Sequence, residues 1–386
     1  MKGKLSFFVI FGISLSLNSA ALSQESNEQI ESPLLLEASI FEQMVSNLHG
    51  GQKEGTLASG EFDLVLTLDT EKSGLWEGGS LVTYFLGYFG EQPSKYVGDM
   101  QGTSNIEGEE TFRVFEAYYE QSLYAEQLTA LIGLRDVNAE FSVLEYAQTL
   151  FNGSFGIGYD ISQVTPSLTP DTTAPALELR WKADGIYAQG IIQDGTPGDP
   201  NHSRGTRVKL GSDDGIYYAT ELGLVNDPEN NESPYRKYGL GYWYHTKPLE
   251  LSDEQTIHNN WGVYFIGERR LCQFEEQDVG IFVQIGYADD ERNAVSNYYG
   301  GGLTIFGPIS GRSEDTLSLG FATAKLSSMA RSSGFDYAET SYELTYKAKL
   351  LDFLYLQPDL QYVVNPGADP LLDDAWVFTL RMEMII

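Results

Sequence analysis

SYELTYKAKLLDFLYLQPDLQYVVNP, residues 341–366, and AWVFTLRMEMII, residues 375–386, are the stretches that decide the fold. In the first, the even positions from Tyr342 to Leu350 are apolar, and the odd positions are Glu343, Thr345, Lys347 and Lys349. In the second, the even positions from Trp376 to Ile386 are apolar, and Thr379, Arg381 and Glu383 lie between them. Alternation with a period of two predicts strands with one apolar face and one polar face.

The second of these stretches places an apolar side chain at the last residue, Ile386. A membrane-spanning sheet has no lipid-exposed edge, because lipid cannot satisfy unpaired backbone groups. Its last strand must therefore pair with its first, so we expect this terminal strand to close an antiparallel up-and-down β-barrel in a membrane.

The composition narrows the class of partner. The chain has 386 residues, with 55 acidic against 24 basic side chains and a formal charge of −31, which argues against nucleic acid as a ligand. The same excess of acid weakens the idea of a phosphate-selective pore, which needs Lys and Arg. Cys272 is the only cysteine, so no intramolecular disulfide is possible.

The N-terminal segment predicts export. Lys2 and Lys4, an apolar run from Leu5 to Leu17, and small residues around Ala21 are typical of a signal peptide over residues 1–23. Ser32-Pro33 followed by apolar residues at helical spacing predicts a short amphipathic helix in a periplasmic segment, residues 24–59. Residues 60–386 would form the barrel.

Strand patterns recur through that barrel region. Alternating runs occur around Phe62, Phe115, Leu177, Leu240 and Ile281, and they are separated by acidic connections rich in Gly, Pro and Asn. At roughly 20 residues for each strand and its connection, the region predicts about 16 strands in an all-β fold. No repeat or linker divides it.

Several segments resemble the carbohydrate-selective porins of Gram-negative outer membranes, the OprB type. The most specific is LQPDLQYVVNPGADP, Leu356 to Pro370; FRVFEAYYEQSL, LIGLRDVNAEF, NGSFGIG and the Gly307–Asp315 stretch follow the family order. The resemblance implies an outer-membrane barrel, a lumen narrowed by inward loops, and passive diffusion of small neutral carbohydrates. It also implies contact with outer-membrane lipid and lipopolysaccharide, as a monomer or homotrimer.

In a pore, the groups that line the lumen set selectivity. We expect carboxylates and guanidinium groups to bind sugar hydroxyls, and aromatic rings to stack on sugar faces. The polar parity of the strands gives as pore-lining candidates Glu116, Tyr118, Glu120, Arg135, Arg180, Lys182, Trp243, Glu343, Lys347, Lys349 and Arg381. Arg135 and Glu116 are the leading candidates, because both lie in the early strand pair that resembles the family.

The sequence carries no pattern typical of an enzyme. His49, His202, His245 and His258 form no HExxH motif, and no catalytic Ser/His/Asp set stands out, so we expect no cofactor, no metal and no catalysis. Two alternatives to a sugar channel remain open. One is a general or cation-preferring diffusion pore, and the other is a non-conducting β protein that binds glycans at the cell surface.

Overall fold

The structure is a computed structural model. It describes residues 32–164, 173–196, 198, 206–208, 210–226, 234–247, 249–250, 256–257, 259–274 and 277–386. The predicted signal peptide, residues 1–23, lies outside the described residues.

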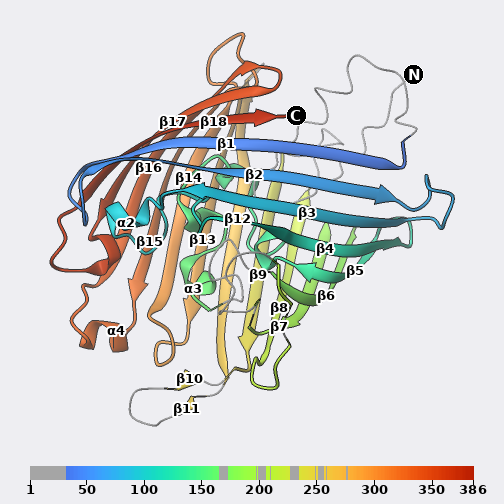
Figure 1. Cartoon of the computed structure of the whole chain (residues 1–386), viewed down its shortest axis with the longest axis horizontal. Helices are drawn as coiled ribbons and strands as arrows, with labels where there is room; N and C mark the ends of the chain where they lie inside the picture. Colours follow the sequence, from blue (N-terminus) through green and yellow to red (C-terminus); the bar gives the residue numbers. More distant parts are fainter. Residues whose placement is uncertain are drawn as a thin grey trace.

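Sixteen strands within the described residues close into one antiparallel barrel (Figure 1). The strands are β1 (Leu34–His49), β2 (Gly55–Asp69), β3 (Gly79–Gly90), β4 (Thr111–Leu123), β5 (Leu128–Arg135), β6 (Ala174–Ala183), β7 (Ile186–Asp194), β8 (Ile216–Asn226), β9 (Arg236–His245), β12 (Asn260–Phe274), β13 (Gln277–Ala288), β14 (Val295–Phe306), β15 (Thr316–Leu326), β16 (Ala338–Leu351), β17 (Leu354–Val364) and β18 (Ala375–Ile385). Each strand pairs with its neighbours in sequence, and β18 pairs with β1. The predicted up-and-down barrel and its closure by the terminal strand are confirmed.

Short elements occupy the connections between strands. They are α2 (Ser94–Val97), η1 (Val137–Ala139), η2 (Glu145–Ala147), η3 (Gly153–Phe155), α3 (Tyr159–Ser162), α4 (Ser328–Ser332), η5 (Pro366–Ala368) and a hairpin of β10 (Leu249–Glu250) with β11 (Thr256–Ile257). In the part of the chain that the structure describes, no helix has the length and apolarity needed to span a membrane.

The predicted N-terminal helix is wrong, because residues 34–49 form strand β1. A spacing of four is also a multiple of two, so Leu36, Ile40 and Met44 share one face of a strand as well as one face of a helix. Strand β1 pairs along its length with β2, and Ile40 lies opposite Met384 of β18. The barrel therefore begins at Leu34, and the boundary expected at residue 60 falls inside β2.

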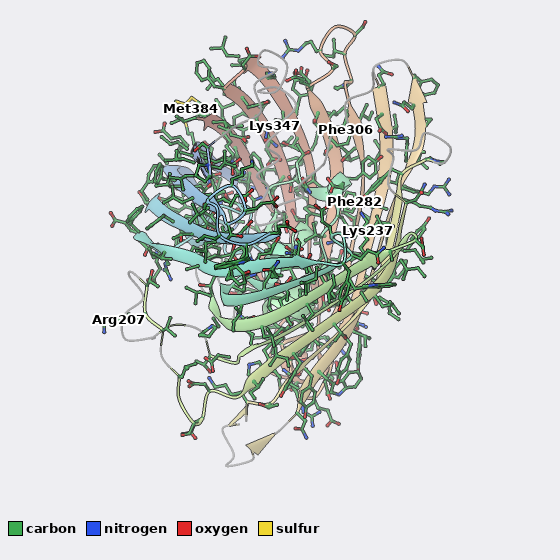
Figure 2. All side chains as sticks on the ribbon, turned by 90° about the vertical axis from the view of Figure 1, so that its right-hand side faces the viewer. Arg207, Lys237, Phe282, Phe306, Lys347 and Met384 are labelled. Atoms are coloured by element: carbon green, nitrogen blue, oxygen red, sulfur yellow. The ribbon has the colours of Figure 1, made fainter. Side chains whose placement is uncertain are left out.

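The two faces of each strand differ as the alternation predicts. In β16, Tyr342 and Leu344 are 52% and 46% exposed on the outer face, whereas Glu343 and Thr345 are 1% exposed on the inner face. Side chains project from both faces of the strands (Figure 2). An apolar outer face and a polar inner face are what a lipid-embedded barrel requires.

Connections at one end of the barrel are long. Those after β3, β5, β7 and β9 are longer than those after β4, β6, β12 and β16. Two of the long connections contact inward-facing side chains, and we name them by their described residues. The first inner segment is residues 91–110, which includes α2, and the second inner segment is residues 136–164, which includes η1, η2, η3 and α3.

Candidate pore lining and inner segments

The second inner segment is bound to the barrel wall through its backbone N–H groups. Glu221 of β8 accepts a hydrogen bond from the N–H of Ser142 at 3.0 Å, and Glu268 of β12 accepts one from Tyr146 at 2.9 Å. Glu343 of β16 accepts from both Phe151 and Asn152, the latter at 2.9 Å. Buried backbone donors need partners, and here carboxylates from three separate strands supply them.

The carbonyl groups of the same segment also have partners on the wall. Gln357 of β17 donates to Thr149 O at 2.7 Å, and Gln284 of β13 donates to Phe155 O at 3.0 Å. Tyr298 and Thr304 of β14 donate their hydroxyl hydrogens to Ser154 O and Tyr146 O at 2.8 and 2.6 Å. These backbone N–H and C=O groups of the segment therefore have their hydrogen-bond partners on the inner wall.

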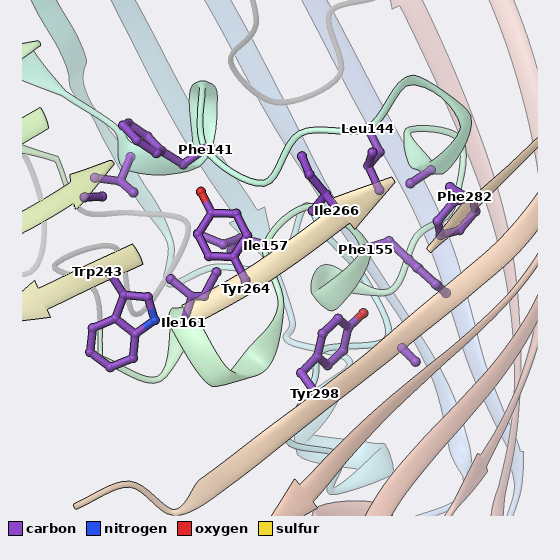
Figure 3. Close-up of a cluster of buried hydrophobic side chains, with 14 of the residues drawn as sticks. Phe141, Leu144, Phe155, Ile157, Ile161, Trp243, Tyr264, Ile266, Phe282 and Tyr298 are labelled. Carbon is purple, nitrogen blue, oxygen red and sulfur yellow. The ribbon is translucent and has the colours of Figure 1, made fainter. Parts of the chain in front are cut away.

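Apolar packing accompanies these hydrogen bonds. Phe141, Leu144, Phe155 and Ile161 of the segment belong to one buried cluster with inward side chains of the wall (Figure 3). Two wall glycines of β13 permit the close approach. A Cβ at Gly280 would lie 2.0 Å from the Tyr146 ring, and one at Gly286 would lie 2.1 Å from the Asp160 carboxylate.

The first inner segment is bound in the same way, to strands β16 and β17, which also bind the second. Glu339 of β16 accepts from the N–H groups of Met100 at 2.8 Å and Gln101 at 3.1 Å, and Gln361 of β17 donates to Thr103 O at 2.7 Å. The two segments meet where the N–H of Gly153 donates to Gly102 O at 2.9 Å. A backbone hydrogen bond therefore joins the two inner segments.

The leading candidates, Arg135 and Glu116, lie together in a buried ion cluster. Arg135 contacts Glu116 at 2.7 Å, Glu178 at 3.1 Å and Glu140 at 3.6 Å, and its side chain is 2% exposed. Its guanidinium also lies 4.3 Å from the centre of the Tyr118 ring. Arg135 therefore has no face available to a passing solute.

Arg180 extends this cluster towards solvent. It contacts Glu120 at 2.6 Å and Glu140 at 2.7 Å, and both Arg180 and Glu120 keep more than a fifth of their side-chain surface exposed. Lys182, which lies on the same face of β6 as Arg180, is exposed. Of the candidates on β4 to β6, the accessible ones are thus Glu120, Arg180 and Lys182.

The remaining candidates divide between wall contacts and the open lumen. Trp243 is fully buried in the apolar cluster, and Glu343 is taken up by the second inner segment. Arg381 binds Gln43, Asn105 and Ser104 and lies 3.6 Å from the centre of the Phe151 ring. Lys347 pairs with Glu383 at 2.5 Å, and Lys349 pairs with Glu314; the two lysine side chains are 18% and 13% exposed.

Several carboxyl groups of the inner segments are perturbed. Burial raises the pKa of Asp160 to about 7, and its carboxylate makes no hydrogen bond with another side chain. Burial also raises the pKa of Glu145 to about 7, and it raises the pKa of Glu107 to about 8 with a smaller contribution from Asp99. These groups change charge near neutral pH, where an exposed carboxylate would not.

Sequence reasoning missed the residues that hold the inner segments. Glu221, Glu268 and Glu339 were not among the candidates, although each is an acidic residue at an inward position of an apolar strand. A single carboxylate at an inward position among apolar residues is the sequence signal that could have identified them, because a buried carboxylate needs hydrogen-bond donors. Within the described residues, no group of three or more His, Cys, Asp or Glu side chains is arranged to hold a metal ion.

Comparison with known proteins agrees with this architecture. A family model described as "Carbohydrate-selective porin, OprB family" matches residues 53–384. Porin B of Pseudomonas aeruginosa is 22% identical over 247 residues, and the match spans 54% of this chain and 54% of that protein, so about half the length of this relative is covered.

Two solved structures share the fold. The high-pH structure of Pseudomonas putida OprB superimposes with a TM-score of 0.81 at 18% identity, covering 92% of this chain and 94% of the other. A mutant of the Rhodopseudomonas blastica porin superimposes with a TM-score of 0.53 at 11% identity, covering 92% and 100%. Barrels of this kind lie in the outer membrane of Gram-negative bacteria. The chain belongs to the carbohydrate-selective porin family, OprB.

Proposed function

We propose that the chain is a passive channel for small neutral carbohydrates, with the two inner segments narrowing its lumen. The observation that supports this most directly is the attachment of the second inner segment to β8, β12 and β16 by Glu221, Glu268 and Glu343. A segment tied to strands around the lumen holds its shape without energy input. Such a lumen selects by diameter and by the polar groups left exposed.

The groups best placed to meet a sugar are those that keep exposed surface. Glu120 and Arg180 offer a carboxylate and a guanidinium side by side, which suits the alternating donors and acceptors of sugar hydroxyls. Lys347 lies 4.7 Å from the centre of the Tyr355 ring, so a flat apolar surface adjoins a charged group there. These pairs replace Arg135 and Glu116 as the sugar-contacting residues that we propose.

Liposome swelling with the purified protein tests the proposal. Glucose, a disaccharide and a neutral amino acid of similar size to glucose would be compared. Faster or saturable entry of glucose relative to the amino acid is the expected result. Rates that depend on solute size alone would reduce the function to general diffusion, and absence of swelling would exclude a channel.

A further inference from the structure

We propose that the lumen sorts sugars by charge, admitting cationic amino sugars and neutral sugars and rejecting anionic ones such as uronates and sugar phosphates. The inference rests on the sugar channel proposed above. It adds the charge class of the substrate, which neither the family nor the fold specifies.

The first step is that five basic side chains of the inner wall are paired with carboxylates. Arg135 and Arg180 each contact three carboxylates, and Arg270 contacts Asp278 at 2.5 Å. Lys347 and Lys349 have the acidic partners given above. An anion entering the lumen would have to compete with these carboxylates for each of these cations.

Arg381 and Lys237 form no salt bridge within the described residues, but both have other partners, and the Lys237 ammonium donates to Val143 O at 2.8 Å. The Arg381 guanidinium donates to the Gln43 and Asn105 amides and the Ser104 hydroxyl, and one face covers the Phe151 ring. Only 6% of the residue is exposed. An anion could reach this group only by displacing part of both inner segments.

The second step is that acid remains in excess. In the cluster around Arg135 and Arg180, two guanidinium groups face four carboxylates, and Glu120 keeps a quarter of its side-chain surface exposed; the four are Glu116, Glu120, Glu140 and Glu178. Glu221 also points inward, and its partners are the hydroxyl groups of Tyr187 and Tyr264 and the N–H of Ser142, which orient its carboxylate without supplying a positive charge. The chain as a whole carries a formal charge of −31, which has the same sign as this excess of acid. Low-dielectric walls around a channel of one sign focus that field along the axis.

The test compares three probes of hexose size: glucosamine, glucose and glucuronate. We expect swelling rates in that order, with glucuronate slower than glucosamine by roughly tenfold, the lower end of what focused fields produce. The zero-current potential in a KCl gradient should also show cation preference. Glucuronate entering as fast as glucosamine, or a preference for chloride, would overturn the proposal.

One ion pair supplies matched variants. Glu383→Gln leaves Lys347 without its acid and should move the zero-current potential towards chloride. Lys347→Gln leaves Glu383 without its cation and should move it towards potassium. Lys72→Gln, in the exposed pair with Asp69 outside the lumen, should leave the potential unchanged. Shifts of the same sign in the first two variants, or no shift in either, would contradict the proposed role of wall charge.

The same experiment separates this inference from the proposed function. If glucose and a neutral amino acid of equal size enter equally fast, sugar selectivity is lost, but the charge order can still hold. If glucose enters faster than the amino acid, but glucosamine, glucose and glucuronate enter at equal rates, the sugar channel is confirmed and the charge inference fails. Heat-modifiable migration of each variant on detergent gels confirms that the barrel has folded.

Discussion

Two sectors of the barrel wall contain buried arginine and buried glutamate, and they use them differently. In β4 to β6, Arg135 lies between Glu116 and Glu178 of the wall and contacts Glu140 of the second inner segment, so its charge is paired there. In β16 to β18, Arg381 contacts amides and a hydroxyl, while Glu343 receives the backbone N–H groups of the second inner segment. The first sector is an ion cluster, and the second is a docking surface for peptide.

A buried carboxylate in this barrel therefore has one of two separable roles: it pairs with a buried cation, or it holds an inner segment. Removing a charge from the ion cluster should destabilise the barrel itself, because the opposite charges remain buried without a partner. Removing a carboxylate from the docking surface should instead release an inner segment and leave the wall intact. Stability and conductance should therefore respond differently in the two sectors.

Arg135→Met should have the largest effect on stability. It leaves Glu116 and Glu178 buried without their cation, and we expect a loss of about 3–5 kcal/mol in the free energy of unfolding. Urea titration of the protein in lipid vesicles measures this loss. Arg135→Lys, which retains the charge, should lose less. A loss from Arg135→Met below that of an exposed substitution would contradict the comparison.

Glu343→Ala should come next and should act on the inner segment. It leaves the N–H groups of Phe151 and Asn152 buried without an acceptor, at about 1–3 kcal/mol for each group. We expect larger single-channel conductance and faster amide exchange at residues 151 and 152. Glu343→Gln keeps an oxygen acceptor and serves as the control. Unchanged conductance in Glu343→Ala would show that the segment is held by other contacts.

Gly286→Ala tests the docking of the second inner segment through packing alone, with no change of charge. The new Cβ would lie 2.1 Å from the Asp160 carboxylate, so this side chain and, where it has no room to rotate, α3 must shift, at a cost of about 1–3 kcal/mol. Gly301→Ala on the outer face of β14, where the nearest side-chain atom is 3.2 Å away, is the matched control. Conductance should rise only in the first variant. Equal conductance in both would show that α3 does not restrict the lumen.

Asp160 should make docking of α3 depend on pH. Its folded pKa of about 7 lies above its ordinary value of 3.8, so the folded state keeps a proton that the unfolded state releases. Stability from this group is present below pH 4 and is lost as the pH rises towards 7, by at most about 1.4 kcal/mol for each pH unit. Amide exchange at residues 159–162 measures it. Asp160→Asn should remove the dependence, and a variant with an unchanged profile would assign it to another group.

Lys72→Ala should have the smallest effect. Lys72 and Asp69 lie 3.9 Å apart with half and more than a third of their side chains exposed, so we expect a change below about 0.5 kcal/mol in urea titration. This exposed pair provides the baseline for the buried ion cluster. A loss as large as that of Arg135→Met would mean that burial does not distinguish the two pairs.

The fold was predictable from the sequence where a strand has one lipid-facing side. In β16 and β18 lipid demands an apolar residue at every second position, and the alternation of Tyr342 with Glu343 shows it directly. In β1 the same alternation was hidden, because Phe41 and Val45 add inward apolar residues that complete a helical pattern. The pairing of β1 with β18, the last strand of the barrel, decides between a helix and a strand.

The site was predictable only in part. Arg135, Glu116 and Arg381 are buried on the polar face that parity assigns to them, but parity does not show what a side chain meets there. The partners of Glu343 are backbone N–H groups about 190 residues away, in a segment without periodicity. Backbone donors have no sequence signature, so anchoring carboxylates cannot be told from solute-binding ones without the structure.

The attachment of the first inner segment has a consequence for assembly. Met100 and Gln101 are synthesised early, but Glu339, which accepts their N–H groups, follows 239 and 238 residues later on β16. Until the C-terminal strands have joined the sheet, these donors have no acceptor on the wall. The first inner segment can therefore dock on the wall only after β16 has joined the sheet, and C-terminal truncation should leave a chain whose early strands can form but whose first inner segment stays undocked.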